Sequence, residues 1–541
     1  MTTDPQTLWK RFQKYYKHFP SIGLSIDISR MHFDDVFLQG MEGRMQRAFQ
    51  AMEELERGAI ANPDENRMVG HYWLRNPALS PTESIRSEIE SNIASIEAFA
   101  SDVHSGKIQG VHGRFKHLLI IGIGGSALGP QFISDSLGSP ADDEMTLHFF
   151  DNTDPDGFDK VLSTLETLPD GRLGQTLTLV ISKSGGTKET RNGMIEAMAA
   201  YNRAGIDFSK HAVAITGNGS ALEMAAVNDH WMSVFPMWDW VGGRTSVFSA
   251  VGLVPAALQG IDIRQLIRGA EACDLVTRER ETISNPAASL ALMWFHSGSG
   301  KGTKAMVVLP YKDRLILFSR FLQQLVMESL GKTLDLDGKP AYQGLSVFGN
   351  KGSTDQHAYI QQLRDGIDNF FVTFVGVSKD RATATVYVED QWITSGDYLH
   401  GLMEGTKTAL FENGRGSITI RIDEVSPFHV GVLISLYERA VGLYAQLINV
   451  NAYHQPGVEA GKSAANRVLE SQRAAVDCLM RRAGHSMTIE DLAMECQMVD
   501  RAETLFAVCE HLAANGRMVK TPGEGIFDAR YALPSGGESS L

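Results

Sequence analysis

Residues 177–190 read LTLVISKSGGTKET, and this short stretch is the best guide to the fold class. An apolar run ends at Ser182, a turn with two glycines follows, and helical character resumes near Arg191. The passage from a buried strand through a glycine turn into a helix is typical of a parallel sheet covered by helices. The segment therefore predicts an α/β fold.

The turn itself has the composition of an anion site. Ser182, Ser184 and Thr187 supply three hydroxyl groups. Gly185 and Gly186 let the backbone come close to a ligand, and the following helix directs its amino end toward the same place. These features predict a site for a phosphate monoester, and a sugar phosphate rather than a nucleotide because no adenine site is evident. A polar turn that merely links strand to helix is the simpler alternative.

The same pattern recurs along much of the chain. Short apolar runs that end in glycine, serine or aspartate alternate with helical patterns, at residues 117–125, 147–152, 177–186, 212–217, 305–311, 370–377 and 417–423. The alternation predicts two tandem α/β domains, each with a mainly parallel sheet flanked by helices, at residues 111–265 and 285–465. Ligands of such sheets bind at the carboxyl ends of the strands, where the glycine turns fall.

Helical additions are expected at both ends. Residues 1–110 carry apolar side chains at spacings of three and four, which predicts a helical N-terminal region. Residues 466–541 read as helices followed by a short terminal hairpin. That order resembles a winged helix, but acidic residues there are as plentiful as basic ones and no helix carries a basic stripe. We therefore expect this module to dock on the body of the protein rather than on DNA.

Composition and charge narrow the class of protein. The chain has 541 residues, 43% of them hydrophobic and 21% charged, which suits a globular protein with two large domains. A net charge of -14 argues against nucleic acid or an anionic membrane as partner. No run of 18 apolar residues and no signal-peptide pattern occurs. The four cysteines form no CxxC pair, so we expect core residues in a reducing cytoplasm.

Three glycine motifs imitate nucleotide sites. Residues 122–127 (GIGGSA) match a dinucleotide-binding turn, and Asp151 stands where a ribose-binding acid would, so an NAD-dependent dehydrogenase is an alternative hypothesis. A single match of this kind carries little weight. Residues 298–303 (GSGKGT) and 457–463 (GVEAGKS) both lack the glycine spacing of a phosphate-binding P-loop.

Four further residues are candidates for acid–base chemistry. Glu328 lies four residues after Gln324 on a segment with a half-buried helical pattern, among apolar neighbours that favour a general base. Arg244 follows two glycines, so it could hold an oxyanion on a fixed turn. His357 occupies a loop of small residues, and Lys462 closes a second polar loop. Each could equally be structural when taken alone.

Six motifs in this order resemble the glucose-6-phosphate isomerase (phosphoglucose isomerase) family, whose members contain two sugar-isomerase (SIS) domains. The resemblance covers about residues 115–465 and rests on GIGGSALGP (122–130), SKSGGTKET (182–190), DWVGGRTSVFSAVG (239–252), QQLVMESLGK (323–332), STDQHAY (353–359) and YHQPGVEAGK (453–462). It implies reversible isomerisation of glucose 6-phosphate to fructose 6-phosphate, a step of glycolysis and gluconeogenesis, without a cofactor or metal.

The resemblance also implies roles for individual residues. His357, helped by Lys462, would protonate the ring oxygen and open the sugar. Glu328 would then move a proton from C2 to C1 through a cis-enediol, while Arg244 stabilises the negative charge. The substrate-binding residues would be Gly125, Ser126, Ser182, Lys183, Ser184, Thr187, Gln324 and Gln455. In this family the histidine comes from the neighbouring subunit, which implies a homodimer.

Two alternatives to this assignment stay open from the sequence. A sugar-phosphate-binding regulator of the same fold would lack the reaction, although it would not need Glu328, Arg244 and His357 together with the phosphate turn. An isomerase that also accepts mannose 6-phosphate would differ in contacts near the C2 hydroxyl, where Thr187 and Gln455 could matter.

Overall fold

The computed structural model describes residues 4–166, 172–390, 392–482 and 484–534 of the chain. The chain forms two compact units, Met1–His454 and Gln455–Leu541, and each is described by itself. None of the described helices is long and apolar enough to cross a membrane.

The first unit contains a five-stranded sheet in which every strand runs parallel to its neighbours, in the spatial order β4-β3-β5-β6-β7. Its strands are β3 (His117–Ile121), β4 (Thr146–Phe150), β5 (Thr176–Ser182), β6 (Ala212–Thr216) and β7 (Ser233–Pro236). All residues of β5 and β6 are buried, because helices cover both faces of such a sheet. The predicted strands at 117, 147, 177 and 212 are confirmed.

A second sheet of six strands has the order β1-β2-β15-β12-β8-β11. Its strands are β1 (Tyr16–Phe19), β2 (Leu24–Asp27), β8 (Ala305–Pro310), β11 (Val347–Phe348), β12 (Phe370–Val377) and β15 (Ser417–Ile422). The last four are parallel, and β1 and β2 form an antiparallel hairpin beside β15. Two further antiparallel pairs are β9 (Lys332–Leu334) with β10 (Pro340–Gln343) and β13 (Tyr387–Glu389) with β14 (Ile393–Thr394).

The β1–β2 hairpin differs from the expectation that residues 1–110 are helical. Each strand has only four residues, too few for a clear alternating pattern. The strand β2 is fully buried because it pairs with β15, a partner far along the chain. A contact of this kind cannot be read from neighbouring residues.

Helices fill the space between and around the two sheets. They are α1 (Pro5–Tyr15), α2 (Asp35–Glu56), α3 (Glu83–Ser105), α4 (Leu128–Leu137), α5 (Pro155–Glu166), α6 (Lys188–Arg203), α7 (Ala221–Asn228), α8 (Ala250–Gln259), α9 (Ile263–Thr277), α10 (Pro286–Ser297), α11 (Phe318–Leu322), α12 (Ile360–Asp365), α13 (Ser395–Glu412) and α14 (Pro427–Leu447). Short 3-10 turns are η1 (Pro20–Ile22), η2 (Pro77–Leu79), η3 (Gly124–Ser126), η4 (Arg172–Gln175), η5 (Phe208–His211), η6 (Gly243–Thr245), η7 (Asp313–Leu315) and η9 (Thr354–His357), whereas η8 (Gln323–Glu328) is π-helical.

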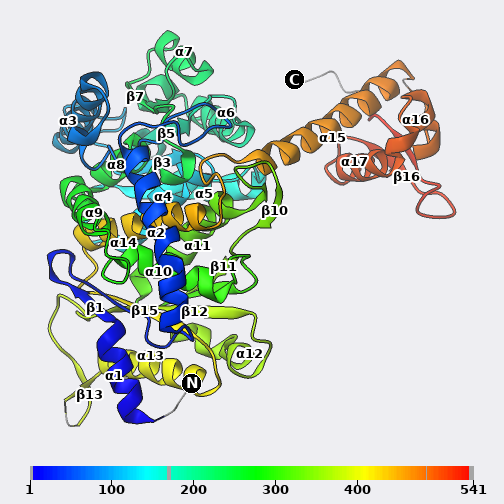
Figure 1. Ribbon diagram of the computed structural model, residues 1–541. Coiled ribbons are helices and arrows are strands. Elements are labelled where there is room, and N and C mark those ends of the chain that lie inside the picture. The colour runs from blue at the N-terminus through cyan, green and yellow to red at the C-terminus, as the bar shows by residue number, and fades with distance from the viewer. Residues whose placement is uncertain (1–3, 167–171, 391, 483, 535–541) are drawn as a thin grey trace. The chain divides into compact units, whose positions relative to one another are not determined.

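The helix α14 is the centre of the first unit. It is buried on nearly all sides and packs against α9, α10 and α2, and most of its residues are apolar. Figure 1 shows it in the layer between the sheet with β3 and β5 and the sheet with β12 and β15. It therefore gives both sheets a shared core.

The two sheets follow the same winding order. In the first, β3 lies between β4 and β5, and in the second, β8 lies between β11 and β12. In each sheet, the next strand along the chain lies on one side of the first strand, and the strand after that lies on the opposite side. Such a reversal opens a crevice at the carboxyl ends of the two central strands.

The second unit is mainly helical and has its own apolar core. Its elements are α15 (Pro456–Arg481), α16 (Ile489–Glu495), the 3-10 turn η10 (Val499–Arg501), α17 (Ala502–Ala514) and the antiparallel strands β16 (Val519–Thr521) and β17 (Arg530–Ala532). Cys478 and Cys509 lie buried in that core, and all four cysteines are free thiols.

Candidate active site

The carboxyl end of the first sheet brings two glycine turns together. η3 follows β3, and residues 183–187 follow β5. These two strands are neighbours in parallel register, with Ile121 opposite Val180, and they flank the point where the winding reverses. Gly125 and Ser126 therefore lie at the same sheet edge as Ser182, which is the edge where ligands of such sheets bind.

Two hydroxyl groups of the turn after β5 face each other, and the third contacts the backbone of the turn. Ser182 Oγ donates a hydrogen bond to Thr187 Oγ1 at 3.3 Å, and the Gly186 N–H donates to Ser184 Oγ at 3.2 Å. Thr187 occupies the N-cap of α6, yet its side chain makes no capping bond. Gly185 adopts φ +69°, and a Cβ there would lie 2.5 Å from the Leu222 nitrogen. Only glycine fits this position, so the turn holds its shape at the amino end of α6.

Lys183 ties this turn to the segment that precedes Arg244. Its Nζ donates to the carbonyl oxygens of Asp239 and Val241, both at 3.0 Å. Burial lowers the pKa of the Lys183 ammonium, and the nearby Asp239 carboxylate opposes the change. The side chain thus fixes the relative position of two loops, while its backbone stays part of the turn.

Arg244 and Glu328 form an ion pair, with Arg244 Nη1 2.9 Å from Glu328 Oε1. The side chain of Arg244 is 5% exposed and that of Glu328 19%. Arg244 Nη2 also donates to the carbonyl oxygens of Ala452 at 2.8 Å and His454 at 3.0 Å. Desolvation lowers the pKa of Arg244, and the Glu328 carboxylate opposes this. The site therefore places a partly desolvated carboxylate beside a cation, and two backbone carbonyl groups also hold that cation in position.

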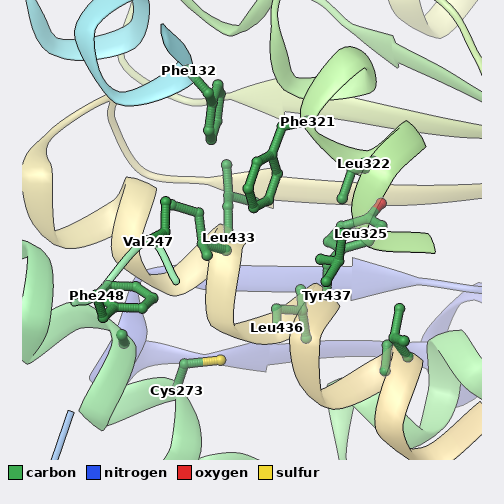
Figure 2. Close-up of a cluster of buried hydrophobic side chains, with 14 of the residues drawn as sticks. Phe132, Val247, Phe248, Cys273, Phe321, Leu322, Leu325, Leu433, Leu436 and Tyr437 are labelled. Carbon is green, nitrogen blue, oxygen red and sulfur yellow. The ribbon is translucent and has the colours of Figure 1, made fainter. Parts of the chain in front are cut away.

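The apolar face of the segment that carries Glu328 packs on α14. As predicted, Leu322, Leu325 and Val326 are buried, and Figure 2 shows Phe321, Leu322 and Leu325 beside Leu433, Leu436 and Tyr437. Residues Gln323–Glu328 form a π-helical turn instead of the expected regular helix. Turns of this kind recur at functional sites because the extra residue redirects side chains.

Close backbone packing brings three loops to the same place. A Cβ at Gly125 would lie 2.0 Å from the Gly243 carbonyl oxygen, so the turns η3 and η6 are in direct contact. A Cβ at Gly124 would lie 3.0 Å from Gln324 Nε2. The turn after β3, the turn before Arg244 and the π-helical turn therefore meet, and Gln324 points toward the glycine turn.

The structure adds residues that the sequence analysis missed. Lys332 Nζ donates to the carbonyl oxygens of Glu328 at 2.8 Å and Ser329 at 2.7 Å. Desolvation, followed by the nearby Arg244 charge, lowers the pKa of Lys332 to about 7. The lysine stands inside the quoted motif at 323–332, but nothing in the spacing indicated that its amine is buried.

A loop from the N-terminal region also reaches the site. Asn62 and Arg67 form an antiparallel bridge, and between them Asp64 accepts a hydrogen bond from Asn451 Nδ2 at 2.6 Å and lies 3.7 Å from His454 Nδ1. The charge of Glu65 acts on both Lys183 and Arg244. The sequence of this loop gave no signal, because the contacts that bring Asp64 to the site are with Asn451 and His454, far along the chain.

His357 lies exposed at the end of η9, on a loop that is well anchored. Its neighbour Asp355 is buried and accepts a hydrogen bond from the Asn350 N–H at 2.9 Å, and Gln356 Nε2 donates to Thr406 Oγ1 at 2.6 Å. The loop thus presents the imidazole to the outside of the subunit. Gln455 and Lys462 belong to the second unit, so their part in the pocket stays a prediction.

Asp151, the acid that suggested a dinucleotide site, has other partners. Its Oδ2 accepts a hydrogen bond from Gln131 Nε2 at 2.7 Å and lies 3.6 Å from Arg320 Nη2. Within the parts of the chain that the structure describes, no group of three or more His, Cys, Asp or Glu side chains is arranged to hold a metal ion.

The chain is similar to known proteins along most of its length. Residues 27–480 match the family model described as phosphoglucose isomerase. The chain is 60% identical over 529 residues to a glucose-6-phosphate isomerase of Citrifermentans bemidjiense, covering 97% of this chain and 99% of that protein. It is 55% identical over 524 residues to the Synechococcus sp. enzyme of that name, with coverage of 96% and 97%. Among solved structures, a glucose-6-phosphate isomerase from Chlamydia trachomatis superimposes with a TM-score of 0.78 at 26% identity, covering 86% of this chain and 92% of that one.

Proposed function

Because the chain belongs to the phosphoglucose isomerase family, we propose that it interconverts glucose 6-phosphate and fructose 6-phosphate, as a step of glycolysis and gluconeogenesis. The observation that carries this proposal is the ion pair between Glu328 and the buried Arg244, close to the hydroxyl-rich turn 182–187. A carboxylate, a fixed cation and a phosphate cradle together suit a proton transfer between two carbons of a sugar phosphate.

The substrate would be anchored by its phosphate. Ser182, Ser184 and Thr187 would donate hydroxyl hydrogen bonds to it, and the amino end of α6 would add N–H groups. Gly125 and Ser126 would line the same pocket from the turn after β3. Lys183 would act mainly through its backbone, because its ammonium already serves the carbonyl oxygens of residues 239 and 241.

The proposed reaction begins with ring opening. His357, assisted by Lys462, would protonate the ring oxygen of glucose 6-phosphate as its bond to C1 breaks, while the C1 hydroxyl loses its proton to water, so that the aldehyde forms. Glu328 would then take the proton from C2, which is acidic only next to the carbonyl, and return it to C1 of the cis-enediol. Gln324 and Gln455 would orient hydroxyl groups during this transfer.

Arg244 would stabilise the negative charge that grows on oxygen while C2 loses its proton. Two backbone carbonyls hold its guanidinium in addition to Glu328. The cation therefore keeps its place when the carboxylate turns from Arg244 toward the substrate. This arrangement supplies preorganised charge and needs no metal or nicotinamide for the proton transfer.

We propose a homodimer as the active form, with His357 entering the pocket of the partner subunit. The exposure of His357 on an anchored loop supports this role. We place the enzyme in the cytoplasm, where its four free thiols would stay reduced.

The first test is an assay of purified protein with fructose 6-phosphate, in which glucose 6-phosphate is followed through a coupled dehydrogenase. A sugar-phosphate-binding regulator would bind the substrate and form no product. Parallel assays with mannose 6-phosphate would show whether the pocket discriminates at C2.

The second test replaces Glu328 by glutamine. We expect Glu328→Gln to fold and to bind substrate, and to lose roughly 10²- to 10⁴-fold or more in kcat, because loss of a positioned base has this effect. Exchange of the C2 hydrogen with D2O should fall in parallel. Glu97→Gln, on the exposed face of α3, is the matched control. Near-normal turnover by Glu328→Gln would remove this residue from the role of base.

A further inference from the structure

Lys332 is a buried amine directly behind the proposed base. It is the first residue of β9 and is only 5% exposed. Its Nζ hydrogen bonds to the carbonyl oxygens of Glu328 and Ser329, at 2.8 and 2.7 Å, join it to the end of the π-helical turn. Neither its burial nor these two contacts is used in the mechanism described above.

The two carbonyl groups need such a donor. The last carbonyls of a helix lack intrahelical partners, and a buried carbonyl without a hydrogen bond is costly. Here the π-helical turn ends at Glu328 and the chain continues into β9 four residues later. Lysine can satisfy both oxygens in either protonation state, because a neutral amine still has two N–H bonds and the ammonium has three.

The surroundings of Lys332 contain charges of both signs. Arg244 lies on η6, Glu328 on η8, Asp64 on the loop 62–67, and His454 follows α14; each interacts electrostatically with the amine. Burial and the Arg244 charge disfavour the ammonium, while Glu328 and Asp64 favour it, and the pKa of Lys332 falls to about 7. The neutral amine keeps the hydrogen bonds without adding a second full cation beside Arg244.

We propose that Lys332 is a positioning residue: its side chain clamps the carbonyls at 328 and 329, fixes the end of the π-helical turn and so holds the Glu328 carboxylate at C2 of the sugar. Arg244 pairs with the carboxylate itself, and Lys332 restrains the backbone that carries the carboxylate when it turns toward the substrate. This inference rests on the proposed isomerase function.

The test compares Lys332→Met, Lys332→Arg and Lys332→Gln with the wild type. Methionine fills similar space without donors, so the turn should relax and the carboxylate should move. A misplacement of about 1 Å can cost roughly 10²-fold in rate, and we expect kcat of Lys332→Met to fall by about 10- to 100-fold with KM nearly unchanged. Proton transfer should then limit the rate more fully, so the primary isotope effect with substrate deuterated at C2 should increase.

The other variants separate positioning from folding. Lys332→Arg retains donors at the end of a long side chain and should recover part of kcat. Lys332→Gln keeps two N–H donors one bond closer to the backbone, so it should give a lower kcat and a larger isotope effect than the wild type. Lys301→Met is the matched control, because Lys301 also donates to a backbone carbonyl, that of Ala341 at 3.4 Å, on the exposed surface.

The outcomes decide between the proposals. If Lys332→Met folds and has wild-type kcat and isotope effect, the positioning role is wrong. If Lys332→Met does not fold, wild-type kcat and isotope effect in Lys332→Gln would refute the positioning role instead. A fall in kcat with an unchanged isotope effect would also overturn it, because it would indicate general damage. Absence of activity in the wild type would instead refute the proposed isomerase.

Discussion

At the scale of single residues, Arg244 illustrates why the site needs an arginine. Its guanidinium contacts the Glu328 carboxylate through Nη1 and the carbonyls of Ala452 and His454 through Nη2. Lysine offers a single nitrogen on a flexible stem, and arginine offers a rigid, planar set of donors. The sequence predicts that Arg244 is a cation for an oxyanion. The structure adds that its guanidinium pairs with the Glu328 carboxylate.

Arg244→Lys tests this geometry. The charge is kept, but one ammonium cannot reach both the carboxylate and the two carbonyls, so a buried oxygen loses its donor. We expect kcat to fall by roughly 10²- to 10³-fold, as for loss of an oxyanion-stabilising donor, and unfolding free energy to fall by about 1–3 kcal/mol. Steady-state kinetics and urea unfolding measure both. Arg264→Lys, at an exposed pair with Glu97, should change neither, and near-wild-type kinetics of Arg244→Lys would contradict the assignment.

At the scale of elements, the site depends on how closely short turns approach one another. The turns η3 and η6 touch through Gly125 and Gly243, which brings the end of β3 next to the residue that precedes Arg244. Glycine at 125 is needed for this close approach rather than for an unusual backbone conformation. The contact links the glycine turn after β3 to the turn that carries Arg244.

Gly125→Ala and Gly243→Ala form a matched pair. A Cβ at 125 would lie 2.0 Å from the Gly243 oxygen, whereas a Cβ at 243 meets nothing within 4 Å. Overpacking of this kind costs about 1–3 kcal/mol or more, so Gly125→Ala should melt several degrees lower and Gly243→Ala should not. Differential scanning calorimetry decides, and equal melting temperatures for the two variants would refute the close contact.

At the scale of the whole molecule, the remaining part of the proposed site would be supplied in the proposed dimer. His357 is exposed in the single chain. In the proposed dimer, this exposed side chain would reach the sugar in the pocket of the other subunit. The dimer would then be the smallest active species, because each pocket would need residues from both chains.

Subunit mixing tests this arrangement. Glu328→Gln and His357→Gln should each be inactive as homodimers. Co-refolding equal amounts should give one intact pocket in each heterodimer, and random pairing in a two-fold dimer predicts recovery of about a quarter of wild-type activity. The same mixture kept as folded homodimers is the control. No recovery after verified subunit exchange would show that both residues act within one chain.

The sequence by itself determined the local elements. The strands at 117, 147, 177, 212, 305, 370 and 417 were predicted because apolar runs and glycine turns are properties of adjacent residues. The same local chemistry indicated the hydroxyl-rich turn, and the ordered motifs indicated the family. The buried face of residues 322–326 was also predicted from helical spacing.

Only the tertiary structure decided what lies beside what. The pairing of Arg244 with Glu328, the loop 62–67 near the site and the addition of β1 and β2 to the second sheet all join residues far apart in sequence. The π-helical turn also escaped prediction, because its apolar side chains pack on α14, a helix about a hundred residues further along the chain. Short-range sequence patterns indicate local conformation. Long-range contacts depend on which apolar surfaces and charged groups pack together when the whole chain folds.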